Sequence, residues 1–428
     1  MATGFEATNL PELNHKMEES SNKTVRFGIL GCASIARKVA RAIGLAPNAT
    51  LGAIASRSKE KAERFAAENG YPATVRVYGS YDEVLEDPCV DAVYVPLPTS
   101  LHVRWAVMAA AKRKHVLLEK PVALDVAELD RILEAVESNG VQFMDGSMWL
   151  HHPRTARIQS FFSLSPSTNT IGPIRFVSIP LHFILYSFSF TISYKENPIF
   201  HMHSSQLTAI NKHTFVILYG LKIHSTSTMP ALAEFLENNI RVKPELDGLG
   251  ALGDLAWYCI GASLWARSYQ LPTSVTALPD VTRNEAGVIL SITASLLWDQ
   301  PNQTLATIHC SFLSHTSMDL AICGSNGSLH LRDFIIPYQE TSASIDLTLG
   351  AKFVDLHIGW NVRPEEVHVA NELPQEALMV QEFSRLVASI RDCGSQPSNK
   401  WPEISRKTQL VVDAVKKSLE LGCKPVFL

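Results

Sequence analysis

The stretch VRFGILGCASIARKVARAIGL, residues 25–45, decides the fold of this chain of 428 residues. Its first six residues form an apolar run that predicts a strand, and the residues from Ile35 to Ile43 predict a helix. Gly28 and Gly31 lie near the point where the strand turns into the helix. Glycine permits a tight turn, and the free N–H groups at a helix N-terminus attract phosphate. The stretch therefore predicts the opening of a dinucleotide-binding domain.

Short apolar strands continue to alternate with helical stretches after this opening. Strands are predicted at residues 50–56, 75–78, 91–96, 115–120 and 141–145, and helices at 59–69, from about Ser80, at 102–112 and at 126–139. This alternation is typical of a parallel sheet with crossover helices. We therefore expect an α/β Rossmann domain over residues 25–148.

The sequence pattern changes after residue 148. Runs with two-residue alternation follow one another through residues 274–334 and predict an antiparallel sheet. Helices are predicted at 375–391 and 405–421, with the loop GSQPSNKWP between them. Residues 149–428 are thus expected to form a second, α+β domain.

The segment 178–225 does not fit this second domain. It holds a single acidic residue, Glu196, and five of the fifteen histidines, and it is dense in Phe and Tyr. It follows neither a helical nor a strand period, and a long loop without structure is improbable inside a compact domain. We interpret it as a retained intron or a wrongly assigned exon. A genuine lid or interaction loop is the alternative.

The charge balance and the cysteines limit the partners of the chain. Lys and Arg number 38 against 42 Asp and Glu, a net charge of −4, which gives nucleic acid or an anionic membrane no electrostatic basis for binding.

The seven cysteines contain no C-x-x-C pair, which favours reduced thiols and neither disulfides nor a metal site. Residues 1–24 lack the apolar run of a signal peptide and are expected to be a disordered tail. We expect a cytoplasmic protein.

The turn after the first strand supplies the first candidate cofactor-binding residues. Ala33 stands where the G-x-G-x-x-G motif usually has its third glycine, so the match is loose. A glycine cluster alone is more often only a turn, but its place between a strand and a helix favours binding. The candidates in this turn are Gly28, Gly31, Cys32, Ala33, Ser34 and Ile35.

The end of the second strand indicates which cofactor is preferred. An acidic residue is expected there for the ribose 2′-hydroxyl of NAD, but the sequence has Ser56 and Arg57. A guanidinium beside a hydroxyl suits a 2′-phosphate, so NADP is favoured over NAD. Alternatively, Arg57 is only a solvated charge at the start of a helix.

Two further motifs follow the fourth and fifth predicted strands, where ligands bind in open parallel sheets. The first holds Pro96, Leu97, Pro98 and His102, and the second holds Glu119 and Lys120. A partly desolvated lysine at such a strand end is a plausible proton relay, because its pKa shifts readily. His102 is a cofactor-binding candidate, or else it simply packs under its helix.

These motifs carry a family resemblance. The Gly-x-x-Gly-Cys-Ala turn, the Pro-x-Pro-Thr-x-x-His run, Glu119-Lys120-Pro121 and GALGDLAWY at residues 250–258 resemble the glucose-fructose oxidoreductase, inositol dehydrogenase and MocA family. Many relatives have D-x-x-x-H in the last motif, whereas this chain has Asp254 and Tyr258. That variant resembles the subgroup of glucose-fructose oxidoreductase and the dimeric dihydrodiol dehydrogenase, the latter also described as NADP-dependent D-xylose dehydrogenase.

The resemblance implies roles for particular residues. Tyr258 would be the acid/base, Lys120 would lower its pKa, and Asp254 would bind the sugar; a packed aromatic is the alternative for Tyr258. Relatives use the connection after the last Rossmann strand to line the substrate cleft, which makes Trp149, His152 and Arg154 candidates. The second domain would have an open, mainly antiparallel sheet whose outer face pairs with another subunit.

The leading hypothesis is an NADP-dependent dehydrogenase that acts on a CH–OH group of an aldopyranose such as D-xylose, or of a vicinal diol. A non-catalytic NADP-binding regulatory protein is the alternative, although such a protein would need neither Lys120 nor Tyr258. An isoform made inactive by the insert is a third possibility. We expect a homodimer or homotetramer, because the strands at 288–298 and 305–312 read as apolar at both alternating sets of positions.

Overall fold

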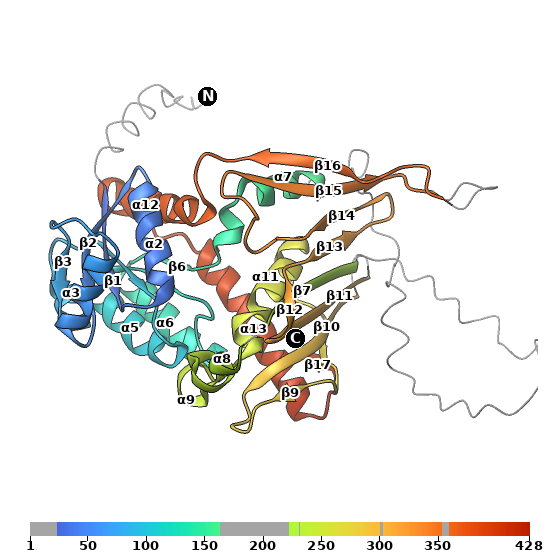
Figure 1. Ribbon diagram of the computed structural model, residues 1–428, viewed down its shortest axis with the longest axis horizontal. Helices are drawn as coiled ribbons and strands as arrows, with labels where there is room; N and C mark the ends of the chain where they lie inside the picture. Colours follow the sequence, from blue (N-terminus) through green and yellow to red (C-terminus); the bar gives the residue numbers. More distant parts are fainter. Residues whose placement is uncertain (1–23, 163–221, 231, 300–302, 353–358) are drawn as a thin grey trace, which may run out of the picture.

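The computed structural model describes residues 24–162, 222–230, 232–299, 303–352 and 359–428, and Figure 1 shows their arrangement. Two sheets form the framework, one from each half of the chain. Helices α11 (Ala256–Ala266) and α13 (Lys400–Glu420) lie between the two sheets (Figure 1). The predicted combination of a Rossmann domain with a second, mainly antiparallel domain is confirmed.

The first sheet has six parallel strands in the order β3-β2-β1-β4-β5-β6. They are β1 (Val25–Leu30), β2 (Ala49–Ala55), β3 (Arg76–Tyr78), β4 (Ala92–Val95), β5 (His115–Leu118) and β6 (Phe143–Asp145). The strands are short and largely buried, because helices cover both faces of the sheet. The strand order reverses between β1 and β4, which is where a sheet of this kind opens a crevice for a ligand.

Five crossover helices connect these strands, and three of them begin at a side chain that caps them. They are α2 (Ser34–Leu45), α3 (Lys59–Glu68), α4 (Tyr81–Glu86), α5 (His102–Ala111) and α6 (Val126–Ser138). The side chains of Ser58, Ser80 and Asp125 each accept a hydrogen bond from the N–H three residues later, at the starts of α3, α4 and α6. The start of α2 has no such cap, and its N–H groups face the cleft described below.

The second sheet runs in the order β16-β15-β14-β13-β7-β11-β10-β8-β17, with β12 on β7 and β9 on β10. Its strands are β7 (Lys222–Pro230), β8 (Ser274–Ala277), β9 (Thr282–Arg283), β10 (Ile289–Trp298), β11 (Thr304–Ser311), β12 (Leu313–Ser317), β13 (Leu320–Cys323), β14 (Gly327–Leu331), β15 (Ser342–Leu349), β16 (Glu365–Ala370) and β17 (Val426–Phe427). All pairs are antiparallel except β7 with β11. Helices α11 and α13 pack on one face of this sheet.

The other face of this sheet is more polar than the sequence suggested. Its positions on β10 and β11 alternate with buried ones and include Thr293, Ser295, Thr307 and His309, all half-buried. The expectation of apolar residues at both alternating sets is therefore wrong, because most of the apolar residues of these strands face the helices. Pairing of subunits through this face stays a prediction.

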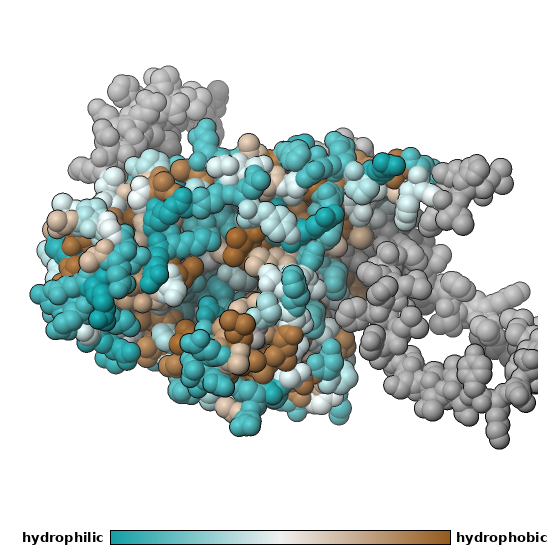
Figure 2. All heavy atoms as spheres, viewed as in Figure 1, coloured by the Kyte–Doolittle hydropathy of each residue, from teal (hydrophilic) through white to brown (hydrophobic). Residues whose placement is uncertain are grey.

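The remaining elements connect the two sheets and surround the crevice. They are the 3-10 turns η1 (Thr99–Leu101), η2 (Met148–His151) and η5 (Ile240–Val242), and the helices α7 (Pro153–Phe162), α8 (Ala233–Asn238), α9 (Pro244–Asp247), α10 (Ala251–Asp254) and α12 (Gln375–Cys393). Figure 2 shows hydrophobic side chains gathered on the lower part of one face, near α8, where Leu232 is exposed. No helix in the described parts of the chain is long and apolar enough to cross a membrane.

The predicted elements lie within a few residues of the observed ones in the first domain. The largest shift concerns α13, which begins at Lys400, inside the predicted loop and five residues before the predicted helix. Residues 178–221 of the proposed insert lie outside the described residues, as do residues 1–23 of the predicted tail. The last four residues of the proposed insert, from Lys222, belong to β7 and pair with β11 and β13. The bounds of the proposed insert stay a prediction.

Candidate active site

A cavity of about 570 Å³ lies at the carboxyl ends of the first sheet. One wall comes from the segments that follow β1, β2, β4 and β5, and the opposite wall comes from η5, α9, α10 and α11 of the second domain. Both domains thus contribute side chains to one site. This is the position that the strand order predicts for a ligand.

The turn from β1 into α2 is shaped for an anionic group. Gly31 has a φ of +123°, which side chains rarely adopt, and a Cβ there would stand 3.0 Å from the Leu97 side chain. The first turn of α2 carries no acidic residue and no capping side chain, so its N–H groups are open to a phosphate. All of the predicted residues in this turn line the cavity except Gly28. A Cβ on Gly28 would stand 2.4 Å from Val84, so that glycine allows close packing behind the turn.

A cationic corner follows β2. Ser56 is buried and Arg57 is exposed, and both line the cavity as predicted. Lys61, one turn into α3, lines the same cavity and was not predicted. Two cations and a hydroxyl therefore meet at the end of the second strand, with no acidic residue among the described residues that line this corner.

The loop after β4 lies in the cavity wall, but its histidine does not. Pro96, Leu97 and Pro98 line the cavity. His102 is buried behind them, and its ring nitrogens lie 2.8 Å from the Leu97 carbonyl oxygen and 3.2 Å from that of Val122. The histidine therefore holds the loop in place from behind, which is the alternative that the sequence left open.

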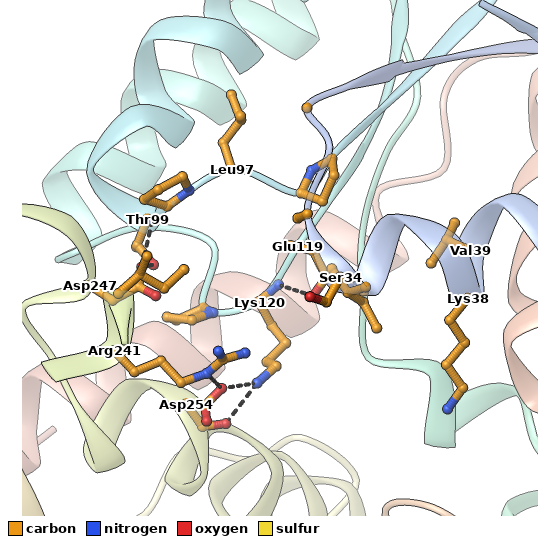
Figure 3. A pocket seen from close by; sticks show the side chains of 18 of the residues that line it. Ser34, Lys38, Val39, Leu97, Thr99, Glu119, Lys120, Arg241, Asp247 and Asp254 are labelled. Carbon is orange, nitrogen blue, oxygen red and sulfur yellow. Dashed lines mark hydrogen bonds and ion pairs between the residues drawn. The ribbon is translucent and has the colours of Figure 1, made fainter. Parts of the chain in front are cut away.

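Lys120 and Asp254 form an ion pair across the two domains (Figure 3). The Lys120 ammonium donates to Asp254 Oδ1 at 2.6 Å and to the Asp254 carbonyl oxygen at 2.9 Å. Arg241 adds a second cation, because its Nε lies 2.9 Å from the same Oδ1. Burial opposes ionisation of Asp254, but the charges of Arg241 and Lys120 outweigh it and hold the pKa of this carboxyl well below its usual range. Asp254 is therefore a carboxylate.

Tyr258 lies against the same lysine with its ring. The Lys120 ammonium is 4.7 Å from the centroid of the Tyr258 ring, and the Tyr258 hydroxyl points to the sulfur of Met148 at 3.7 Å. Burial, followed by the charges of Glu119 and Asp254, raises the pKa of Tyr258 well above its ordinary value. Arg241 is the cation that opposes this rise. The expected lowering of this pKa by Lys120 stays a prediction.

Glu119 lines the cavity but is bound from behind. Its Oε1 accepts a hydrogen bond from the Tyr94 hydroxyl at 2.5 Å, and its Oε2 accepts one from the Lys120 N–H at 3.2 Å. Burial raises the pKa of Glu119. These contacts fix the backbone at Lys120, so Glu119 positions the lysine.

The three predicted substrate-binding residues do not line the cavity. Trp149 is buried against the rings of Trp265 and Phe334. His152 is buried, and its Nδ1 accepts a hydrogen bond from the Arg154 N–H. The Arg154 guanidinium is itself buried and paired with Asp333 at 2.5 Å. The chain passes close to the cleft here, but these side chains point into the second domain.

Several cavity residues were not predicted. Asn239, Ile240, Arg241 and Asp247 come from the second domain, and Thr99 from the first. The sequence stretch NIRVKPELD, residues 239–247, contains most of them, and its two cations and one amide before the GALGD motif were a usable signal. Asp247 Oδ1 accepts hydrogen bonds from the N–H and the hydroxyl of Thr99, at 2.6 and 2.5 Å. This contact joins the two walls.

Two family models match the chain. Residues 25–147 match the oxidoreductase family with an NAD-binding Rossmann fold, and residues 221–330 match the GFO/IDH/MocA C-terminal domain. Together they span just over half of the chain.

Curated relatives and solved structures are similar to the chain over different lengths. D-xylose 1-dehydrogenase (NADP(+)) 2 of Haloferax volcanii is 40% identical over 31% of this chain and 39% of its own length. Other relatives with 36–47% identity are likewise matched over less than half of their length. Trans-1,2-dihydrobenzene-1,2-diol dehydrogenase of Xenopus laevis is 24% identical over 79% of this chain and 87% of its own. The structure of aldose-aldose oxidoreductase from Caulobacter crescentus has a TM-score of 0.67 and 18% identity, and covers 95% of this chain and 100% of that one, a likeness of fold.

Proposed function

Because the chain belongs to the GFO/IDH/MocA oxidoreductase family, we propose that it is an NADP-dependent dehydrogenase acting on a CH–OH group of an aldopyranose or a vicinal diol. The observation that carries the proposal is the cluster of Lys120, Asp254 and Tyr258 at the cofactor end of the first sheet. The relatives named for D-xylose and for a dihydrodiol support this substrate class.

The cavity fits a dinucleotide with a 2′-phosphate. The turn at Gly31 and the uncapped start of α2 would hold the pyrophosphate, and Ser56, Arg57 and Lys61 would hold the 2′-phosphate. When bound, the cofactor supplies a nicotinamide ring that accepts or gives a hydride. The protein positions the substrate and moves the proton.

The three residues of the cluster would divide this work. Asp254 is ionised and accepts a hydrogen bond from a substrate hydroxyl. Tyr258 exchanges a proton with the reacting oxygen, as a donor when a carbonyl is reduced. Lys120 keeps its positive charge beside both and stabilises negative charge on that oxygen.

The proposal is tested by a screen of aldoses and vicinal diols with purified protein and NADP, followed by the absorbance of the reduced cofactor. Turnover of at least one of these substrates is expected. If the protein binds NADP tightly and turns over none of them, the proposal is wrong and the regulatory alternative gains support.

We expect the protein to bind NADP about 10 to 100 times more tightly than NAD. Arg57 offers a charged, forked contact to the 2′-phosphate, and such contacts contribute about 1.5–3 kcal/mol. Arg57→Ala should therefore weaken NADP binding by this factor and leave NAD binding unchanged. Titration of both cofactors by fluorescence measures this. Lys59→Ala, at an exposed helix start outside the cavity, is the control. Equal affinity of the wild type for both cofactors would refute the assignment.

The rate of alcohol oxidation is expected to rise with pH, whereas carbonyl reduction stays level through the neutral range. The raised pKa of Tyr258 keeps the phenol protonated at neutral pH, which suits proton donation but leaves little phenolate to accept a proton. Initial rates in both directions, from about pH 6 to 10, measure the two profiles. The increase of the oxidation rate with pH should be absent in Tyr258→Phe. A pH-independent oxidation rate in the wild type would contradict the role of Tyr258.

A further inference from the structure

The two carboxylate oxygens of Asp254 have different surroundings: Oδ1 contacts protein cations, and Oδ2 is available to a ligand. Its Oδ1 accepts from Lys120 and also lies 2.9 Å from Arg241 Nε. None of the described residues donates a hydrogen bond to its Oδ2. The residue lines the cavity and its side chain is 11% exposed. An ionised carboxylate thus retains an acceptor site at the cavity wall.

Arg241 supplies donors beside that acceptor. Its side chain is 36% exposed and lines the cavity. Its Nη1 has one long contact, 3.4 Å to the side-chain oxygen of Asn239, and Nη2 donates to none of the described residues. Asn239 also accepts from the Arg241 N–H, which anchors the segment η5 at the wall. The guanidinium therefore has N–H groups left for a ligand.

A donor and an acceptor side by side select the kind of group they bind. A hydroxyl both donates and accepts, so it satisfies the guanidinium and the carboxylate at once. A carboxylate or phosphate group accepts only, and it would meet the negative charge of Asp254. An ammonium group would meet the positive charges of Arg241 and Lys120. The pair is complementary to a neutral hydroxyl.

The position of the pair relative to Tyr258 identifies which hydroxyl it would bind. Asp254 is the last residue of α10 and Tyr258 lies in the first turn of α11. Both side chains lie against Lys120, whose ammonium is 2.6 Å from Asp254 Oδ1 and 4.7 Å from the centroid of the Tyr258 ring. Two neighbouring hydroxyls of one molecule can therefore each reach one of these side chains.

We propose that Arg241 and Asp254 together bind the hydroxyl next to the one that is oxidised, which makes Arg241 a specificity-determining residue for vicinal diols. The inference rests on the proposed function, in which Tyr258 serves the reacting oxygen. The competing role for Arg241 is purely structural, as an anchor for Asp254 and thereby for Lys120. An anchor would affect every substrate equally.

A matched pair of ligands separates these roles. Trans-1,2-cyclohexanediol and cyclohexanol differ by one hydroxyl, and each is measured for equilibrium binding to the protein saturated with NADP and for kcat/KM. In the wild type the diol is expected to bind about 10 to 100 times more tightly than cyclohexanol, because one hydrogen bond to a charged group contributes a factor of this size. Arg241→Met should remove most of this preference, because it weakens the binding and lowers the kcat/KM of the diol more than those of cyclohexanol, and for the diol it should raise KM more than it lowers kcat. Lys243→Met removes a charge from the same segment, outside the cavity, and should change neither.

Each outcome decides one question. An equal loss for diol and mono-alcohol in Arg241→Met, or a wild type without preference for the diol, overturns the role of Arg241. Binding with the expected preference, but without turnover of either ligand or of any aldose or diol in the screen, leaves the inference standing and refutes the proposed function. Turnover of both ligands with equal kcat/KM supports the proposed function and overturns the inference about Arg241.

Discussion

Replacing Lys120 with alanine or Tyr258 with phenylalanine is expected to lower kcat by about 10²–10⁴-fold. The two side chains touch in the cavity, with the ammonium 4.7 Å from the centre of the ring. If they serve one proton transfer, the double variant should lose little more than either single variant, because residues that act as a unit are not additive. NADP affinity should stay within a few fold, since the residues proposed to hold the phosphates lie elsewhere in the cavity wall.

The measurement is steady-state kinetics on the best substrate of the screen, together with NADP titration of each variant. Conservative Lys120→Arg serves as a second test, because it keeps the charge but not the geometry of the contact to Asp254. Additive losses would show that the two residues act independently. An active Tyr258→Phe enzyme would remove Tyr258 from proton transfer.

Arg154→Ala is expected to lower the free energy of unfolding by about 3–5 kcal/mol, because it leaves a buried carboxylate without its cation. The Arg154 side chain is 2% exposed, and its Nη2 also donates to the Asp333 carbonyl oxygen at 2.9 Å. Asp333 in turn accepts from the Tyr338 N–H. KM for the substrate should change little in protein that remains folded, since Arg154 does not line the cavity.

Denaturant unfolding measures the effect of Arg154→Ala, provided that the slope of the unfolding free energy against denaturant concentration is the same for wild type and variant. Arg157→Ala, on the same helix with its guanidinium over the ring of Phe161, is the control and should cost no more than about 1 kcal/mol. Replacing Arg154 with Met and Asp333 with Leu together should recover much of the loss. A raised KM with unchanged stability in Arg154→Ala would restore Arg154 as a substrate-binding residue.

The first domain could be predicted from the sequence because its signals are local. Each strand is a short apolar run, and several helices begin at a side chain that caps them. The carboxyl ends of parallel strands converge on one edge, so the sequence alone places the residues after β1, β2, β4 and β5 together. Arg57 and Lys120 were found in this way.

The missed and misplaced residues depend on long-range packing. Arg241 follows a stretch with no strong period, and only the folded chain brings it against Asp254, thirteen residues later. Trp149 and Arg154 follow the last Rossmann strand closely, but sequence distance does not say which way a side chain turns. Asp333, the partner of Arg154, is 179 residues away in the chain.

Lys120 and Asp254 form an ion pair but come from different domains, so cofactor binding and proton transfer depend on different halves of the chain. The lysine and the phosphate-binding turn belong to the first domain, whereas the carboxylate and the tyrosine belong to the second. A substitution at Asp254 or Tyr258 would leave nucleotide binding intact and abolish the reaction, turning an enzyme into a sensor of its cofactor in one mutational step.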